Sequence, residues 1–373
     1  MTVKTCGLLE QLKSIPDPRR QCKNLWHKLA DILVIGFCGV LAGCDDFVEI
    51  ATWASHHEEF FRTFLELPNG IPSHDTFGRV CAMVRPATLQ GVLLTWLHQR
   101  RGDPGELVHI DGKYMRRTRR HSQNLGALDV VSAWASQAGL TLGQVAVEAK
   151  SNEITAIPQL LALLDLRDKI VTIDAAGCQK DIAAAIVEGG GDHVLAVKDN
   201  QPTLHAEIQA AFATVKTTVL PGRQEYTTEE KGHGRQEQRT VRVLPVGSHL
   251  SQGAAWAGVL SLVMVVRVVT CTATGVVSQD AGYYLSSLRP NARRIGGAIR
   301  GHWTIENGLH WVLDVVFRED ARRIYDRVAA QNIAFMNRLA LSILRGDPAK
   351  ASLKVKRKQA GWDIHYLAQL LGF

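Results

Sequence analysis

Two short apolar runs in the middle of the chain are each followed at once by an aspartate. Asp111 follows Leu107–Ile110, and Asp174 follows Ile170–Ile173. Apolar runs of this length are typical of buried strands. A carboxylate at the end of such a strand is held rigidly, and two of them on neighbouring strands can share a divalent cation. Either aspartate alone would more often be a turn residue, but the pair predicts an α/β fold with a metal-binding edge.

The segments around these runs predict three strands joined by short links, followed by helix, strand, helix and strand. The further predicted elements are the strands Val130–Trp134, Leu142–Val147 and Val194–Val197 and the helices Ile154–Leu164 and Asp181–Val187. This is the element order of the RNase H-like fold, an α/β sheet covered by helices. We therefore expect the first part of such a catalytic core over residues 105–215.

The N-terminal region has a different pattern. Residues 1–100 carry apolar residues at helical spacing and predict an all-α domain. Within it, Ser73 is the expected N-cap of a short helix over Asp75–Val84. Separate helical modules often read the major groove of DNA, so this helix is the candidate recognition element if the chain binds DNA.

The C-terminal part predicts three further regions. Residues 216–288 form a β-rich insertion, residues 289–345 return to a helical pattern that completes the core, and residues 346–373 form a basic tail. The expected strands of the insertion are Tyr226–Thr228, Gln238–Leu244, Val259–Cys271 and Ala281–Leu285.

A third carboxylate is expected from the C-terminal helical region. Four residues form an apolar stripe at helical spacing: Ile305, Leu309, Val312 and Val316. At about 100° per residue, Glu306 lies at the edge of this stripe. An acid there would be partly buried beside the sheet, where a metal ion could offset the cost of desolvation. An acid on a solvated helix face remains the alternative.

Other residues near Glu306 give competing interpretations. By the same helical period Asp314 should point away from the sheet, whereas Glu319 and Asp320 suit surface ion pairs. His302, Glu306 and His310 are spaced four residues apart, which leaves a zinc site as a weaker possibility.

Composition limits the class of protein and the compartment. A net charge of +7 suits a polyanionic partner. The seven cysteines contain no Cys-x-x-Cys pair, which indicates reduced thiols and argues against zinc. No segment reaches the roughly 20 apolar residues of a membrane span. We expect a cytoplasmic protein without a membrane partner.

Several motifs together resemble the DDE transposases of bacterial insertion sequences, in particular the H-repeat-associated group. In order, they are IPDPRRQCKNLWHKLADIL, IPSHDTFGRV, IDGK, TIDA, VKDNQPTL, GHGRQEQR, HWTIENGLHWVLDVVFRED and the AGWD tail. The match covers nearly the whole chain. It implies an RNase H-like core interrupted by a β-rich insertion, with Asp111, Asp174 and Glu306 as the catalytic residues that bind Mg²⁺, or Mn²⁺ in its place.

The resemblance also implies an activity and partners. The enzyme would hydrolyse a phosphodiester at the ends of its own element and then join the freed 3′ hydroxyl to target DNA, both by in-line displacement. It would act on double-stranded DNA, as inverted-repeat ends and as target, and form a homodimer on DNA at the nucleoid. An RNase H-like nuclease that never joins strands is one alternative. A catalytically inactive DNA-binding copy is another.

One departure from the wider relatives concerns DNA contact. Many of them carry Tyr, Arg, Glu and Lys in a fixed pattern around the helical Glu, where this chain has Ile299, His302, Glu306 and Leu313. Arg300 and His302 are therefore the expected substitutes for the missing basic residues.

Other basic residues are candidates for phosphate contact. Those that follow Asp111 are Lys113, Arg116, Arg117, Arg119 and Arg120, and those in the insertion are His233 and Arg235. For the stretch Lys350–Lys358 near the C-terminus, solvated surface and phosphate contact are both open.

Overall fold

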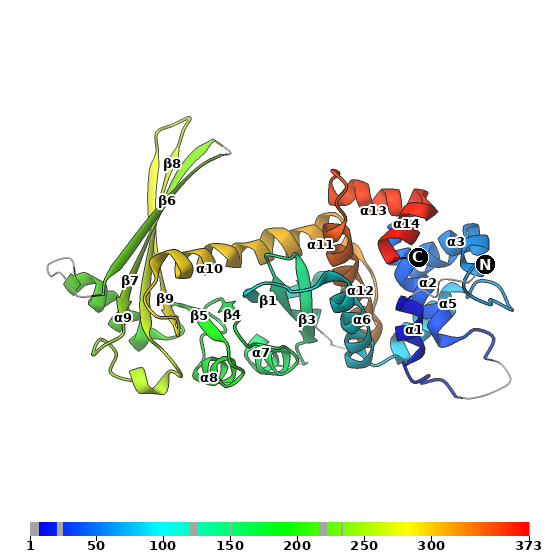
Figure 1. Cartoon of the computed structure of the whole chain (residues 1–373), viewed down its shortest axis with the longest axis horizontal. Coiled ribbons are helices and arrows are strands. Elements are labelled where there is room, and N and C mark those ends of the chain that lie inside the picture. The colour runs from blue at the N-terminus through cyan, green and yellow to red at the C-terminus, as the bar shows by residue number, and fades with distance from the viewer. Residues whose placement is uncertain are drawn as a thin grey trace. The chain divides into compact units, whose positions relative to one another are not determined.

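The computed structural model describes residues 7–20, 25–119, 126–148, 151–215, 222–232 and 234–372. Packing divides the chain into two compact units. The helical unit comprises Met1–Pro104, Gly112–Lys150 and Asn307–Phe373, and the sheet unit comprises Gly105–Asp111 and Ser151–Glu306. Figure 1 shows the whole chain, and each unit is described by itself.

The sheet unit is built on a mixed sheet with the strand order β1-β4-β5-β9-β8-β7-β6. In that order the strands are Leu107–Met115, Ile170–Ile173, Asp192–Val197, Val277–Ser286, Ser261–Cys271, Arg235–Pro245 and Gln224–Gly232. β1, β4 and β5 run parallel, and each later neighbour is antiparallel. Parallel strands need crossover connections, which α7 (Glu153–Leu161) and α8 (Lys180–Glu188) supply.

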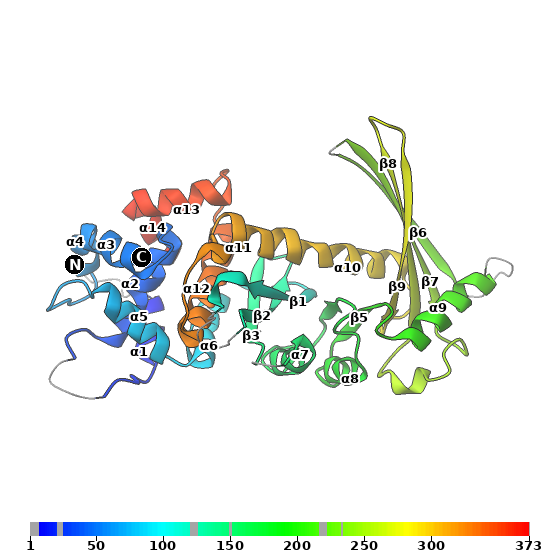
Figure 2. The ribbon, with the colours of Figure 1, turned by 180° about the vertical axis from the view of Figure 1, so that it is seen from behind.

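Helices cover both faces of this sheet. Figures 1 and 2 show α10 (Ala292–Thr304) on one side of β4 and β5, with α7 and α8 on the other. α10 contacts β4, β5, β6 and β7, and its Ile295 and Ala298 are fully buried in a core shared with Ile170, Val194 and Val241. α9 (Pro202–Val215) packs against β8 and β9.

The predicted order of strands and helices is confirmed, with β4 over the predicted residues. The β-rich character of the region after residue 216 is also confirmed for its described residues. These strands do not form a sheet of their own, however, because β9 pairs with β5 from Val194↔Ser286 to Val197↔Tyr283. Alternating apolar residues predict a strand but do not specify its partner.

The helical unit contains the remaining elements. They are α1 (Gly7–Lys13), α2 (Leu29–Ala42), α3 (Phe47–His56), α4 (Glu58–Arg62), α5 (His74–Met83), α6 (Pro86–Arg101), β2 (Leu128–Ala135), β3 (Leu140–Ala146), α11 (Trp311–Val315), α12 (Arg327–Gly346), α13 (Leu353–Trp362) and α14 (Ile364–Leu371). α12 is the centre of this unit, since it contacts α2, α5, α6, α13, β2 and β3 and is buried from Asn332 to Leu344.

The helices predicted for the first 100 residues are confirmed in outline. Ser73 is the N-cap of α5, as expected, and its hydroxyl accepts a hydrogen bond from the Thr76 amide at 3.3 Å. α5 and α6 both pack against α12. A separate role for residues 1–100 in reading DNA ends therefore stays a prediction.

Two apolar segments raise the question of membrane insertion. α2 is buried throughout, and the run ending at Cys271 is the strand β8. Among the described helices, none alone has the length and apolarity of a membrane span. α5 and α6 reach the length and apolarity of a membrane span only when they are taken together, and they are bent by 98° where they meet.

Candidate active site

The two aspartates lie at the same end of adjacent parallel strands. The register between β1 and β4 ends at Ile110↔Ile173, so Asp111 and Asp174 are the next residue on each strand. Both side chains are half-buried. The Asp174 carboxylate accepts a hydrogen bond from the Gly177 amide at 3.3 Å, which helps to orient it. The predicted proximity of these two strands is confirmed.

One detail of this prediction is wrong. Asp111 does not end its strand, because β1 continues to Met115 whereas β4 stops at Ile173. Past Asp111 the side chains still alternate between buried and exposed positions, as a strand with one covered face requires. Asp111 therefore marks the end of the ladder shared with β4.

A buried polar cluster lies one layer below the aspartates. His109 and Thr172 are paired in the β1–β4 register. The Thr172 hydroxyl lies 2.6 Å from His109 Nδ1 and 2.8 Å from Nδ1 of His302 on α10. Burial lowers the pKa of His109 to about 3, with His302 adding to the effect, so its ring is neutral. Burial also lowers the pKa of His302, against an opposing effect of Asp174. His302 is half-buried and hydrogen-bonds through Nδ1 to Thr172, and its contact with DNA stays a prediction.

Glu306 lies in a turn of π-helix, Ile305–His310, that separates α10 from α11. π-turns inside α-helices are rare and frequently occur at functional sites. The apolar stripe is confirmed at Ile305, Leu309 and Val312, which are buried. Glu306 itself is exposed, contrary to the partial burial expected. The expectation assumed an α-helical period through this segment, and the wider turn changes the directions of the side chains.

The structure does not by itself complete a metal site. Across the described part of the chain, no three His, Cys, Asp or Glu side chains lie close enough to hold one ion. Neither the zinc alternative at His302, Glu306 and His310 nor the triad of Asp111, Asp174 and Glu306 is such a group. That Glu306 joins Asp111 and Asp174 stays a prediction.

The positions of Asp314 and Glu319, two further acids after Glu306, differ from those predicted from the sequence. Asp314 does not point away from the strands, because its carboxylate lies 2.6 Å from the buried ammonium of Lys113 on β1. Glu319 is not a surface acid, since it is fully buried in an ion pair with Arg338 of α12 at 2.9 Å. The π-turn accounts for the error at Asp314. At Glu319 the arginines next in sequence suggested the wrong partner.

The candidate DNA contacts differ in their availability. Arg116, Arg117, Arg119 and Arg235 are exposed. The position of Lys113 in a buried ion pair weighs against phosphate contact. Arg300 is engaged by Glu230 of β6 in a two-pronged pair at 2.9 and 3.3 Å. Arg120 and His233 lie outside the described residues.

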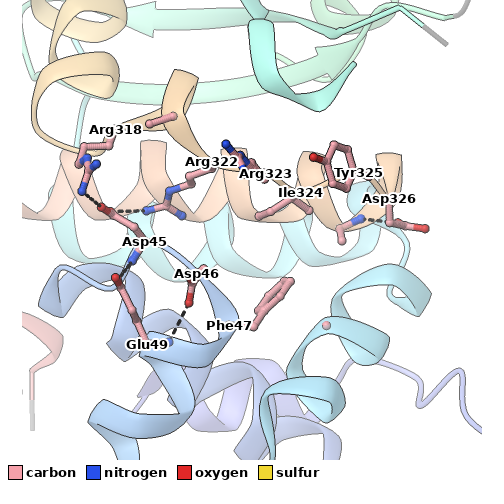
Figure 3. Close-up of a pocket in the computed structure, with 13 residues that line it drawn as sticks. Asp45, Asp46, Phe47, Glu49, Arg318, Arg322, Arg323, Ile324, Tyr325 and Asp326 are labelled. Carbon is pink, nitrogen blue, oxygen red and sulfur yellow. Dashed lines mark hydrogen bonds and ion pairs between the residues drawn. The ribbon is translucent and has the colours of Figure 1, made fainter. Parts of the chain in front are cut away.

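The basic stretch at the C-terminus is in part a structural element. Lys356 and Arg357 of α13 are buried, so neither solvated surface nor phosphate contact describes them. Arg357 donates to the carbonyl of Val40 at 3.3 Å and approaches Asp45 at 3.5 Å. Asp45 also accepts from Arg318 and Arg322 beside a cavity of about 640 Å³ (Figure 3).

Sequence reasoning missed a second cavity, of about 390 Å³, within the sheet unit. It lies between α10 and the strands β6 to β9. The residues that line it include three aromatic ones, Tyr226, Tyr284 and Trp303, and four arginines, Arg239, Arg267, Arg293 and Arg300. No short motif could reveal this site, because its residues come from five different elements.

Comparisons with known proteins identify the family. Residues 97–343 match the family model described as “Transposase DDE domain”, and residues 9–97 match its associated N-terminal model. The chain is 37% identical to the “H repeat-associated putative transposase YhhI” of Escherichia coli K12, over 98% of this chain and 97% of that protein. It is 38% identical to the “Putative transposase YncI” of Escherichia coli O157:H7, over 98% and 94%. The chain belongs to the family of transposases with a DDE domain.

Proposed function

We propose that this chain is a DDE transposase that cleaves DNA at the ends of its insertion sequence and joins the 3′ ends to target DNA. The observation that carries the proposal is the parallel β1–β4 ladder, whose last printed pair, Ile110 and Ile173, directly precedes Asp111 and Asp174. The parallel strands β1, β4 and β5, with the crossover helices α7 and α8, support an RNase H-like core. The helices on both sides of β4 and β5 also support an RNase H-like core.

The donor set fits a hard divalent cation. Asp111 and Asp174 offer carboxylate oxygens, which Mg²⁺ and Mn²⁺ prefer, and we propose Glu306 as the third acid. A bound ion would supply activation of the attacking oxygen and stabilisation of the leaving one. The chain's own contribution is orientation, since the Gly177 amide holds the Asp174 carboxylate.

DNA would be held mainly by exposed arginines. Arg116, Arg117 and Arg119 follow the strand that carries Asp111, and Arg235 begins β7. We propose that they contact phosphates of both element ends and target, in a homodimer assembled on DNA. We propose α5 as the element that reads the ends, through its exposed His74 and Arg79.

The experiment that tests the function uses the purified full-length protein and linear DNA ending in the inverted repeats that flank its gene. Cleaved ends and joined products, lost with EDTA and restored by Mg²⁺ or Mn²⁺, would support the proposal. Cleaved ends without joined products would favour the RNase H-like nuclease. Specific binding without cleavage in any metal would favour the inactive copy.

Salt dependence should separate phosphate contacts from structural cations. Arg117→Ala should weaken DNA binding and lower the slope of log K against log salt by about 0.9, because one counterion fewer is released. Lys113→Met should leave that slope unchanged. It should lower the free energy of unfolding by roughly 1–3 kcal/mol, since Asp314 loses a charged hydrogen-bond partner.

Binding isotherms at several salt concentrations, together with urea unfolding, measure both effects. A lower slope in Lys113→Met would return this lysine to the DNA-contacting set.

Truncation is not a suitable test of the role of the N-terminal region. Removing residues 1–104 would expose the face of α12 that α5 and α6 cover.

A further inference from the structure

One hydrogen-bonded cluster contains residues that lie close in sequence to each of the three proposed catalytic acids. On a strand, residues two apart face the same side, which relates His109 to Asp111 on β1 and Thr172 on β4 to Asp174 just after it. His302 lies near the C-terminal end of α10, and Glu306 is the second residue of the π-turn Ile305–His310 that follows this helix.

The cluster depends on a single hydroxyl. Thr172 Oγ1 lies within hydrogen-bond distance of both imidazoles, at 2.6 Å from His109 and 2.8 Å from His302. The hydroxyl has one proton, so it donates to one ring and accepts from the other. Loss of this hydroxyl would remove the two side-chain hydrogen bonds through which Thr172 links His109 of β1 to His302 of α10.

The packing around the cluster is close. The His109 and His302 rings meet edge to face, with centroids 5.9 Å apart. Gly301 lies directly over the His109 ring, and a Cβ on this glycine would come within 3.0 Å of Cε1. α10 can therefore approach β1 this closely because residue 301 has no side chain. The next turn of the same helix begins the π-turn that contains Glu306.

We propose that His109, Thr172 and His302 form a positioning cluster that sets where Glu306 lies relative to Asp111 and Asp174. The cluster does not touch the reacting atoms. It holds the C-terminal end of α10 against the two strands, one layer below the acids. This inference rests on the proposed function, since it assumes that the three acids share metal ions.

Thr172→Val tests the proposal, because valine keeps the shape of threonine and removes the hydroxyl. The full-length variant should bind Mn²⁺, measured as loss of the free-ion EPR signal, with a Kd raised about tenfold, the lower end of the range for residues that orient metal ligands. The Mg²⁺ concentration for half-maximal cleavage should rise in parallel. Thr172→Ser should restore both values.

Ser261→Ala is the matched control within the same unit. Ser261 is also fully buried, and its hydroxyl donates to the Leu288 carbonyl at 2.6 Å, away from the cluster. Its loss should lower the melting temperature without changing the Kd for Mn²⁺. A Thr172→Val protein that loses stability but binds Mn²⁺ as Ser261→Ala does would overturn the proposal.

A double variant isolates the route through Glu306. If the cluster acts through this acid, Thr172→Val should add no further loss of Mn²⁺ affinity to Glu306→Gln, so the two effects should not be additive. Additive losses would overturn the proposed route. If Thr172→Val does not fold, His302→Phe applies the same test, because it keeps a ring and removes Nδ1. Unchanged Mn²⁺ binding in Asp111→Asn would instead refute the metal site itself, and the cluster's role with it.

Discussion

Asp111→Asn and Asp174→Asn should each reduce cleavage of element ends by at least about a thousandfold. A metal ion at such a site contributes several kcal/mol of transition-state stabilisation, and each 1.4 kcal/mol is a factor of ten in rate. Asparagine keeps the side-chain shape but removes the charge that holds the cation. Both positions are half-buried and outside the apolar core, so folding and DNA binding should be retained.

The measurement is single-turnover cleavage of labelled ends, with circular dichroism and DNA binding as checks on each variant. Asp181→Asn is the control, since this exposed acid lies in the first turn of α8 in the same unit. It should cleave as the unchanged protein does. Near-normal cleavage by either of the other two variants would remove that aspartate from the site.

Local sequence patterns were sufficient to predict the elements whose structure depends on residues close to one another in the chain. The run Ile170–Ile173 is a strand because apolar β-branched residues fit a buried ladder, and Ser73 caps α5 because its hydroxyl satisfies a free amide. The pairing of the strands that precede Asp111 and Asp174 followed from the order of strands and helices. Each of these inferences uses information within a few residues or within one connection.

The errors arose where partners are distant in sequence. Nothing near Lys113 shows that its ammonium pairs with Asp314, about 200 residues later. The pairing of β9 with β5 likewise depends on the whole sheet. The π-turn at Ile305–His310 has no sequence signature comparable to a helix cap, yet it shifts every later residue of the helix relative to an α-helical projection.

The tests of Glu306 and Glu319 should give opposite results, although both acids lie in the same motif. Glu306 is exposed, so Glu306→Gln should change the free energy of unfolding by less than about 0.5 kcal/mol. It should nevertheless lose cleavage as the aspartate variants do, if this acid completes the site.

Glu319→Gln should instead lower the free energy of unfolding by about 3–5 kcal/mol. Its carboxylate accepts from the guanidinium of Arg338 at 2.9 Å, and both side chains are fully buried. Asn337 also donates to this carboxylate, at 3.3 Å. Removal of the negative charge leaves Arg338 without its counter-ion inside the protein, which is costly because a buried charge without a partner is poorly solvated.

A paired replacement separates this penalty from the value of the ion pair itself. Glu319→Met combined with Arg338→Met removes both charges, and buried pairs replaced in this way often lose little stability. The double variant should therefore be more stable than either single variant in urea unfolding. Cleavage is then compared at temperatures where each protein is folded. A Glu306→Gln protein that cleaves as the unchanged protein does would remove Glu306 from the proposed site.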